Sequence, residues 1–259
     1  MSMVTSRFED GVATITLNHR ESCNSLSEKM IEGIRQAIAE LSEKPTRVLV
    51  LRAEPGAKVW SSGLNIHELP VSGRDPLTYN DPLECLMRDI QRFKAPVIAM
   101  VEGGVWGGAC DLTFVCDIVI GGPAASFAIT PAKLGVPYNV SGAMHFINIV
   151  GVRIAREMFY TAEPIPAERA LQVGILNHLV PLEHLEEFTY AMAGRIAKNS
   201  PVANSAMKEQ FRLLADNYPI RPESFEYIQG LRRTVYDSQD YKEGKAAFFE
   251  KRKPVFTGQ

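Results

Sequence analysis

The sequence contains few cysteines, few histidines and little net charge, and each shortage excludes a class of protein. Its 259 residues include four cysteines and five histidines, which form no C-x-x-C pair and no zinc-type spacing. We therefore expect reduced, buried thiols rather than a disulfide framework or a metal centre. The formal net charge of −2 gives no electrostatic reason to expect a nucleic acid or a membrane surface as partner.

Long apolar runs are also missing. No segment has the uninterrupted apolar length of a membrane span, because Asp111 and Asp117 interrupt the best candidate. The first ten residues lack the apolar run of a signal peptide, and residues 257–259 are not a peroxisomal address. By default, the sequence predicts a cytoplasmic protein.

Strand and helix patterns alternate through the first half of the chain. Apolar or alternating runs predict strands at residues 12–17, 47–51, 97–101 and 116–120. Between the first two, Ser27 is a candidate N-cap for a helix that ends before Pro45. This order predicts an α/β fold with a mostly parallel sheet.

After about Ser141 the pattern becomes mainly helical. Helices are predicted at residues 167–173, 182–198, 202–214, 225–233 and 241–253. No flexible linker or low-complexity tract separates the two halves. We therefore expect one domain over residues 1–259, with a core at about 1–190 and a helical region at about 191–259.

Two glycine-rich turns could carry chemistry. The first is Ser61-Ser62-Gly63-Leu64-Asn65; the second is Gly103-Gly104-Val105-Trp106-Gly107-Gly108, where a helix is predicted to begin near Gly108. A helix N-terminus offers unpaired N–H groups to an anion or a developing oxyanion, and glycine permits close approach. The alternative is that the glycines only punctuate loops. Neither turn has the spacing of a P-loop or a dinucleotide fingerprint.

Four segments in a fixed order make the sequence resemble the crotonase (enoyl-CoA hydratase/isomerase) superfamily. They are Asn24-Ser25-Leu26, Ser61-Ser62-Gly63, Gly107-Gly108-Ala109 and the stretch at residues 170–177. The resemblance covers about residues 4–253. It implies a spiral of β-β-α units, a helical C-terminal oligomerisation region, and a homotrimer or a dimer of trimers. It also implies an oxyanion hole formed by the N–H groups of Leu64 and Gly108.

The same resemblance implies an acyl-CoA substrate, with no separate cofactor and no metal. The residues implied in holding it are Cys23, Ser25, Ser62, Gly63, Leu64, Asn65, Ile66, Gly108, Thr130 and Lys251. Lys251 is a candidate contact for a CoA phosphate. The charged run at residues 250–253 has a simpler alternative as a solvated helix end.

Longer segments resemble the branch of this family that decarboxylates malonyl-type CoA thioesters. They lie at residues 73–77, 130–139, 235–238 and 250–254. The resemblance implies conversion of methylmalonyl-CoA to propionyl-CoA. Tyr138 would then hydrogen-bond the departing carboxylate, with Thr130 beside it. The alternatives are that Tyr138 is a surface aromatic and that Thr130 only ends a strand.

The carboxylates favour the same branch. A hydratase uses two carboxylates as general acid and base. By resemblance these positions carry Asp111 and Ala132, and Ala132 cannot ionise. Carbon–carbon cleavage by decarboxylation needs no base, only stabilisation of the enolate. Asp111 is a candidate catalytic residue; alternatively it is a capping residue in the first helical turn.

The sequence departs from the decarboxylase pattern at one place. That branch carries His-Asp where this chain has Leu64 and Asn65. Any non-proline residue still supplies the N–H, and Asn65 can cap the following helix. Two other classes of function stay open. One is another crotonase-type enzyme, an isomerase, hydratase or C–C hydrolase in which Asp111 acts as base. The other is a non-catalytic CoA- or RNA-binding homologue.

Overall fold

Two sheets and a set of helices make up the computed structural model, which describes residues 2–69, 79–215 and 222–258. The first sheet has six strands in the order β1-β2-β3-β5-β7-β10. Their bounds are β1 Val4–Glu9, β2 Val12–Leu17, β3 Val48–Ala53, β5 Val97–Val101, β7 Ile118–Gly121 and β10 His178–Leu179. Only β1 and β2 pair in antiparallel fashion, so the predicted mostly parallel sheet is confirmed.

The central strand β3 is buried at all six of its residues, because both of its faces are covered. Leu49 and Leu51 point to the main core beneath α1 (Glu28–Ser42) and α2 (Pro82–Arg92). Val48 and Val50 point the other way and pack with Leu185 of α6 (Leu182–Ala197). Ser27 caps α1 as predicted, its hydroxyl accepting the N–H of Met30.

One predicted strand starts too early. Residues 116–120 were expected to be extended, but β7 begins at Ile118. The side chain of Asp117 explains the boundary: its Oδ2 accepts the N–H of Val97 and the Nζ of Lys208. The sequence patterns also missed α2 and α4 (Val140–Thr161), the second of which is kinked at Gly151.

The second sheet places the two glycine-rich turns side by side. It has four short strands, β4 (Val59–Ser61), β6 (Gly104–Trp106), β8 (Ser126–Ala128) and β9 (Ile165–Pro166). The strands β4, β6 and β8 are parallel neighbours. Their carboxyl ends therefore meet at one edge, where residues 62–64, Gly107 and Thr130 follow.

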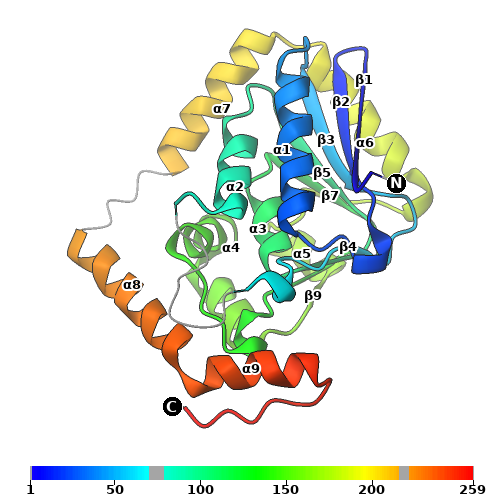
Figure 1. Cartoon of the computed structure of the whole chain (residues 1–259). Helices are drawn as coiled ribbons and strands as arrows, with labels where there is room; N and C mark the ends of the chain where they lie inside the picture. Colours follow the sequence, from blue (N-terminus) through cyan, green and yellow to red (C-terminus); the bar gives the residue numbers. More distant parts are fainter. Residues whose placement is uncertain (1, 70–78, 216–221, 259) are drawn as a thin grey trace.

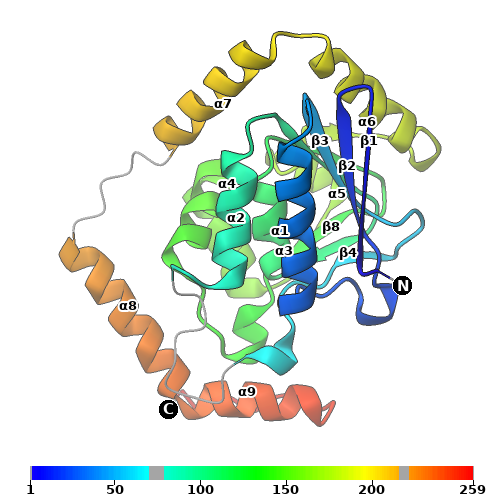
Figure 2. The same ribbon diagram turned by 45° about the horizontal axis from the view of Figure 1, so that its top comes forward.

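Helices dominate the C-terminal part, as predicted. They are α5 (Ala167–Gln172), α6, α7 (Pro201–Ala215), α8 (Pro222–Asp237) and α9 (Gln239–Phe249). Figures 1 and 2 show α7 and α8 lying around the outside of the core, while α9 crosses one end of it. The helix α9 stops at Phe249, so the charged run at residues 250–253 follows the helix and is not part of it. Within the described residues, no helix is long and apolar enough to span a membrane.

Candidate active site

The first glycine turn is fixed by its backbone. Gly63 has φ +81°, and its carbonyl accepts the N–H of Leu26 at 2.8 Å. A Cβ on Gly63 would collide with the carbonyl oxygen of Trp106 and lie 2.9 Å from the nitrogen of Gly108. Only glycine meets both the conformation and the contact distance.

The second turn presents a helix N-terminus to the first. Gly107 has φ +55° and donates its N–H to Ala128, and α3 (Gly108–Phe114) begins at the next residue. A Cβ built on Gly108 would lie 3.8 Å from the nitrogen of Leu64. In the part of the chain that the structure describes, neither Leu64 nor Gly108 donates its N–H to a hydrogen bond. The two predicted oxyanion donors are therefore adjacent and available.

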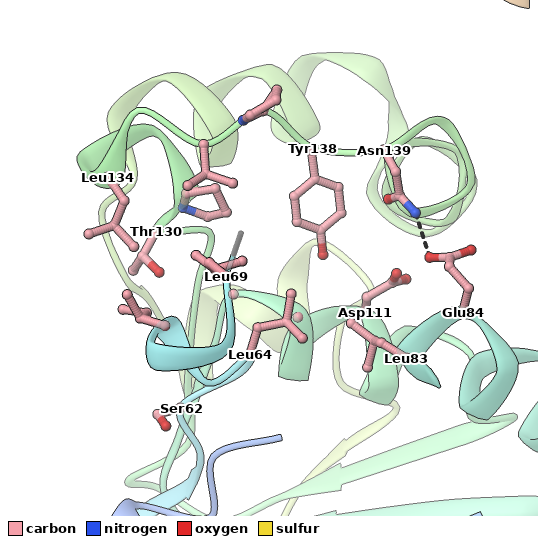
Figure 3. Close-up of a pocket in the computed structure, with 16 residues that line it drawn as sticks. Ser62, Leu64, Leu69, Leu83, Glu84, Asp111, Thr130, Leu134, Tyr138 and Asn139 are labelled. Carbon is pink, nitrogen blue, oxygen red and sulfur yellow. Dashed lines mark hydrogen bonds between the residues drawn. The ribbon is translucent and has the colours of Figure 1, made fainter. Parts of the chain in front are cut away.

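Above these donors lies a small cavity of about 70 Å³ (Figure 3). Its lining is largely apolar, with a few polar side chains. The lining residues are Ser62, Leu64, Ile66, Leu69, Leu83, Glu84, Gly107, Gly108, Asp111, Thr130, Pro131, Leu134, Val136, Pro137, Tyr138 and Asn139. Of the predicted site residues, the cavity brings together Ser62, Leu64, Ile66, Gly108, Asp111, Thr130 and Tyr138.

Tyr138 is a partly buried residue of this cavity and not a surface aromatic. Its ring packs edge-on against Phe146 and Phe159, with centroids 5.7 Å and 5.0 Å away. Its hydroxyl points into the cavity (Figure 3). Burial, and to a lesser extent the nearby Asp111, raises the pKa of the phenol well above its usual range. Tyr138 is therefore a neutral hydrogen-bond donor at any working pH.

Asp111 is engaged with a histidine and does not cap its helix. Its Oδ1 lies 2.6 Å from Nδ1 of His145 on α4, and the two side chains are 4% and 17% exposed. The N-cap of α3 is Gly107, with no side-chain capping bond. The sequence patterns do not indicate this pairing, because His145 and Asp111 lie 34 residues apart in the sequence.

Glu84 is a second carboxyl group in the cavity that the sequence patterns did not single out. One of its oxygens accepts the side-chain N–H of Asn139 and the other accepts the hydroxyl of Ser141 at 2.8 Å. Burial raises the pKa of Glu84. The sequence does carry a signal at Asn139, the partner of Glu84. An asparagine before an apolar segment is typical of a helix N-cap, and Asn139 caps α4 by accepting the N–H of Gly142.

Other predicted binding residues lie behind or outside the cavity lining. Asn65 caps the short helix η2 (Ile66–Glu68) by accepting the N–H of His67, as expected. Cys23 is exposed, and its carbonyl accepts the N–H of Ser62 at 3.0 Å. Ser25 and Gly63 do not line the cavity themselves. The motif at residues 73–77 lies outside the described residues.

The helix α9 packs against Leu69 and Leu134, two residues of the cavity lining, and Lys251 follows the helix. Nζ of Lys245 donates to the carbonyl of Leu69, and the ring of Phe249 lies 4.9 Å from that of His67. Gly244 packs against the carbonyl of Leu134, which is part of the lining. Lys251 is exposed just beyond these contacts.

The model of the enoyl-CoA hydratase/isomerase family matches residues 7–259. The chain belongs to this family. The predicted resemblance and the α/β crotonase fold are therefore confirmed.

Within the enoyl-CoA hydratase/isomerase family, the chain is similar to methylmalonyl-CoA decarboxylase of Escherichia coli (strain K12). The two are 47% identical over 247 residues, which cover 95% of each chain. A solved structure of methylmalonyl-CoA decarboxylase in complex with 2-nitronate-propionyl-CoA superimposes with a TM-score of 0.97 at 46% identity, covering 99% of both chains. The mitochondrial enoyl-CoA hydratase of Pongo abelii is 30% identical over 96% of this chain and 84% of its own length.

Proposed function

We propose that this protein decarboxylates methylmalonyl-CoA to propionyl-CoA without a cofactor, through an enolate bound by the N–H groups of Leu64 and Gly108. One observation carries the proposal: the same small cavity holds two available backbone donors and the hydroxyl of Tyr138. The similarity to a decarboxylase over 95% of both chains supports it.

The donors at Leu64 and Gly108 would bind the thioester oxygen, where negative charge develops as the carbon–carbon bond breaks. Preorganised donors of this kind stabilise such a charge without reorganisation. The Tyr138 hydroxyl would donate to the departing carboxylate and hold it out of the thioester plane, with Thr130 beside it. The apolar lining from Leu83 and Val136 favours the loss of charge as carbon dioxide forms.

The CoA part would extend along the backbone of residues 62–66 and past Cys23 and Ser25, with Lys251 contacting a phosphate. Lys251 follows α9, whose Phe249 lies against the end of the cavity formed by η2, and this placement supports the contact. A homotrimer or dimer of trimers is part of the proposal. It is supported by large apolar side chains that α7 and α8 leave exposed, including Phe211, Leu214 and Tyr227. A cytoplasmic location stays a prediction.

A hydratase is the second candidate, because Asp111 and Glu84 both line the cavity. Ala132, the position expected to carry the second hydratase carboxylate, is not part of the lining. Glu84 does not replace it well, because both of its oxygens already accept hydrogen bonds from Asn139 and Ser141. These contacts favour decarboxylation over the addition of water.

The test is to incubate the purified protein with methylmalonyl-CoA and with crotonyl-CoA, and to follow the products by mass spectrometry. We expect propionyl-CoA from the first substrate without added cofactor, and no appreciable hydration of the second. Efficient hydration of crotonyl-CoA with methylmalonyl-CoA untouched would refute the decarboxylase proposal and favour the hydratase. Binding of CoA thioesters with no turnover would favour a non-catalytic homologue.

A further inference from the structure

A second cavity lies behind the wall of the first. Its volume is about 410 Å³, and it is lined by residues of α2, α4, α7 and α8. Glu84 and Asn139 line both cavities and so form their common wall. His145 lines the second cavity, whereas its partner Asp111 lines the first. The hydrogen-bonded pair Asp111–His145 therefore connects the two cavities.

The contacts of His145 suit a group that changes its protonation state. Its Nδ1 lies 2.6 Å from Oδ1 of Asp111, and its Nε2 lies 3.1 Å from Nε2 of Gln91. An amide nitrogen only donates, so in this orientation Nε2 of His145 accepts and Nδ1 carries the proton toward Asp111. If the Gln91 amide turns over, its oxygen can accept a proton from Nε2 of an imidazolium.

Enolate formation leaves a demand for one proton. Loss of carbon dioxide from the substrate carboxylate gives an enolate, and the α-carbon must take up one proton to give propionyl-CoA. Two carboxyl groups that could donate this proton line the first cavity, those of Glu84 and Asp111. Glu84 has both oxygens occupied as acceptors, whereas Asp111 is bonded to a group that can supply a proton.

We propose that His145 supplies the proton that Asp111 delivers to the α-carbon; this inference rests on the proposed function. The carboxylic acid form of Asp111 gives its proton to the enolate and becomes a carboxylate. Water in the second cavity protonates Nε2 of the neutral His145, which carries its own proton on Nδ1, and the resulting imidazolium passes the Nδ1 proton to Asp111. Proton exchange of the neutral ring with water then restores the Nδ1–H tautomer. One proton enters from solvent for each carbon dioxide released. The other charged groups lining the second cavity within the described residues are Glu84, Arg88, Arg92, Arg212 and Arg232.

The same pathway operates in reverse on the product, and this permits a test that does not need decarboxylation. In D₂O, Asp111 as a carboxylate removes an α-proton of propionyl-CoA, and His145 exchanges it with the solvent. We expect the wild-type protein to incorporate deuterium at the α-carbon. His145→Ala should slow this exchange by about 10²-fold, a typical loss for one acid–base group.

Two comparisons separate proton transfer from a structural role of His145. His145→Gln can still hydrogen-bond Asp111 but carries no exchangeable imidazole proton, so it should stay as slow as His145→Ala. Added imidazole should restore exchange to His145→Ala, because the second cavity gives it access to the vacated position. Thermal melts check that both variants fold, and His184→Ala, at an exposed histidine, serves as the matched control for added imidazole.

Each outcome decides the proposal. No α-exchange by the wild-type protein, full exchange by His145→Gln, or a failure of imidazole to restore His145→Ala would each refute the pathway. So would loss of exchange in Glu84→Gln with exchange retained in His145→Ala, because Glu84 would then be the donor. Exchange on propionyl-CoA without carbon dioxide release from methylmalonyl-CoA would keep the pathway and reject the proposed function.

Discussion

The cavity above α3 and the cavity between α2, α4 and α8 share Glu84 and Asn139 but differ in size and lining. The first measures about 70 Å³ and is mainly apolar, with two backbone N–H donors at its base. The second measures about 410 Å³ and is rich in arginine and amide side chains. An apolar enclosure strengthens each hydrogen bond made to a developing charge, whereas a polar cavity can hold water. The comparison therefore assigns charge stabilisation to the first cavity and proton supply to the second.

We expect the largest loss of activity when one of the two proposed oxyanion donors of the first cavity is removed. Gly108→Pro deletes the N–H at the first residue of α3, a position where a helix tolerates proline. We expect decarboxylation to slow by about 10²- to 10³-fold. Gly108→Ala is the matched control, since it keeps the N–H and places a Cβ 3.2 Å from Leu83. Unchanged turnover in a folded Gly108→Pro protein would remove Gly108 from the oxyanion hole.

Removing the Tyr138 hydroxyl should have the next largest effect. Tyr138→Phe keeps the packing on Phe146 and Phe159 but loses the donor to the substrate carboxylate. A hydrogen bond to a charged group contributes about 1.5–3 kcal/mol, so turnover should fall roughly 10- to 100-fold. The ratio of wild-type to variant rates should stay level up to pH 10, because burial keeps the phenol protonated. Tyr160→Phe, at an exposed tyrosine, is the control.

The raised pKa of Glu84, which lies in the common wall of the two cavities, can be tested through the pH dependence of stability. The pKa of Glu84 in the folded protein is raised above its ordinary value of 4.5, so the folded state binds the extra proton within this window. The contribution of Glu84 to the stability of the wild-type protein should therefore fall as pH rises from 4.5 through the raised pKa. Glu84→Gln lacks this loss, so its free energy of unfolding relative to wild type should increase over the same interval. Denaturant melts measure it, with Glu40→Gln at an exposed carboxyl as control. A difference independent of pH would contradict the raised pKa.

The smallest effect is expected outside both cavities. Lys251→Ala should raise the KM for methylmalonyl-CoA by no more than about fivefold, since an exposed ion pair contributes about 0.2–1 kcal/mol. The corresponding pantetheine thioester has no 3′-phosphate or diphosphate and should be unaffected. Lys253→Ala, in the same charged run, is the matched control. Equal losses with both thioesters would remove Lys251 from the CoA site.

The backbone part of the site could be predicted from the sequence because it depends on local features. Gly63 and Gly108 follow short strands, and a glycine at a predicted helix start indicates backbone N–H groups that an anion can approach closely. The strands β4, β6 and β8 have three residues each, too few to show a period, so the second sheet was missed. The second sheet brings the two glycine-rich turns together, and this meeting was predicted only through the family resemblance.

The side chains around the first cavity were harder to predict because their partners are distant in the sequence. Glu84 bonds Asn139, 55 residues away, and Asp111 bonds His145, 34 residues away. No periodicity or motif in a single sequence encodes such pairs. Asp111 lies in the first turn of α3, as the capping alternative assumed, but that local interpretation could not include its contact with His145.

The arrangement at Gly63 and Leu64 separates what natural variation can change from what it cannot. Gly63 is fixed by its left-handed backbone and by the carbonyl of Trp106, so replacing it would move the donor that follows. Leu64 supplies that donor through its main chain, and its side chain is therefore free to differ. The same side chain lines the first cavity. Position 64 can thus be reshaped for a different acyl group, by evolution or by an engineer, while the N–H that we propose to stabilise the enolate stays in place.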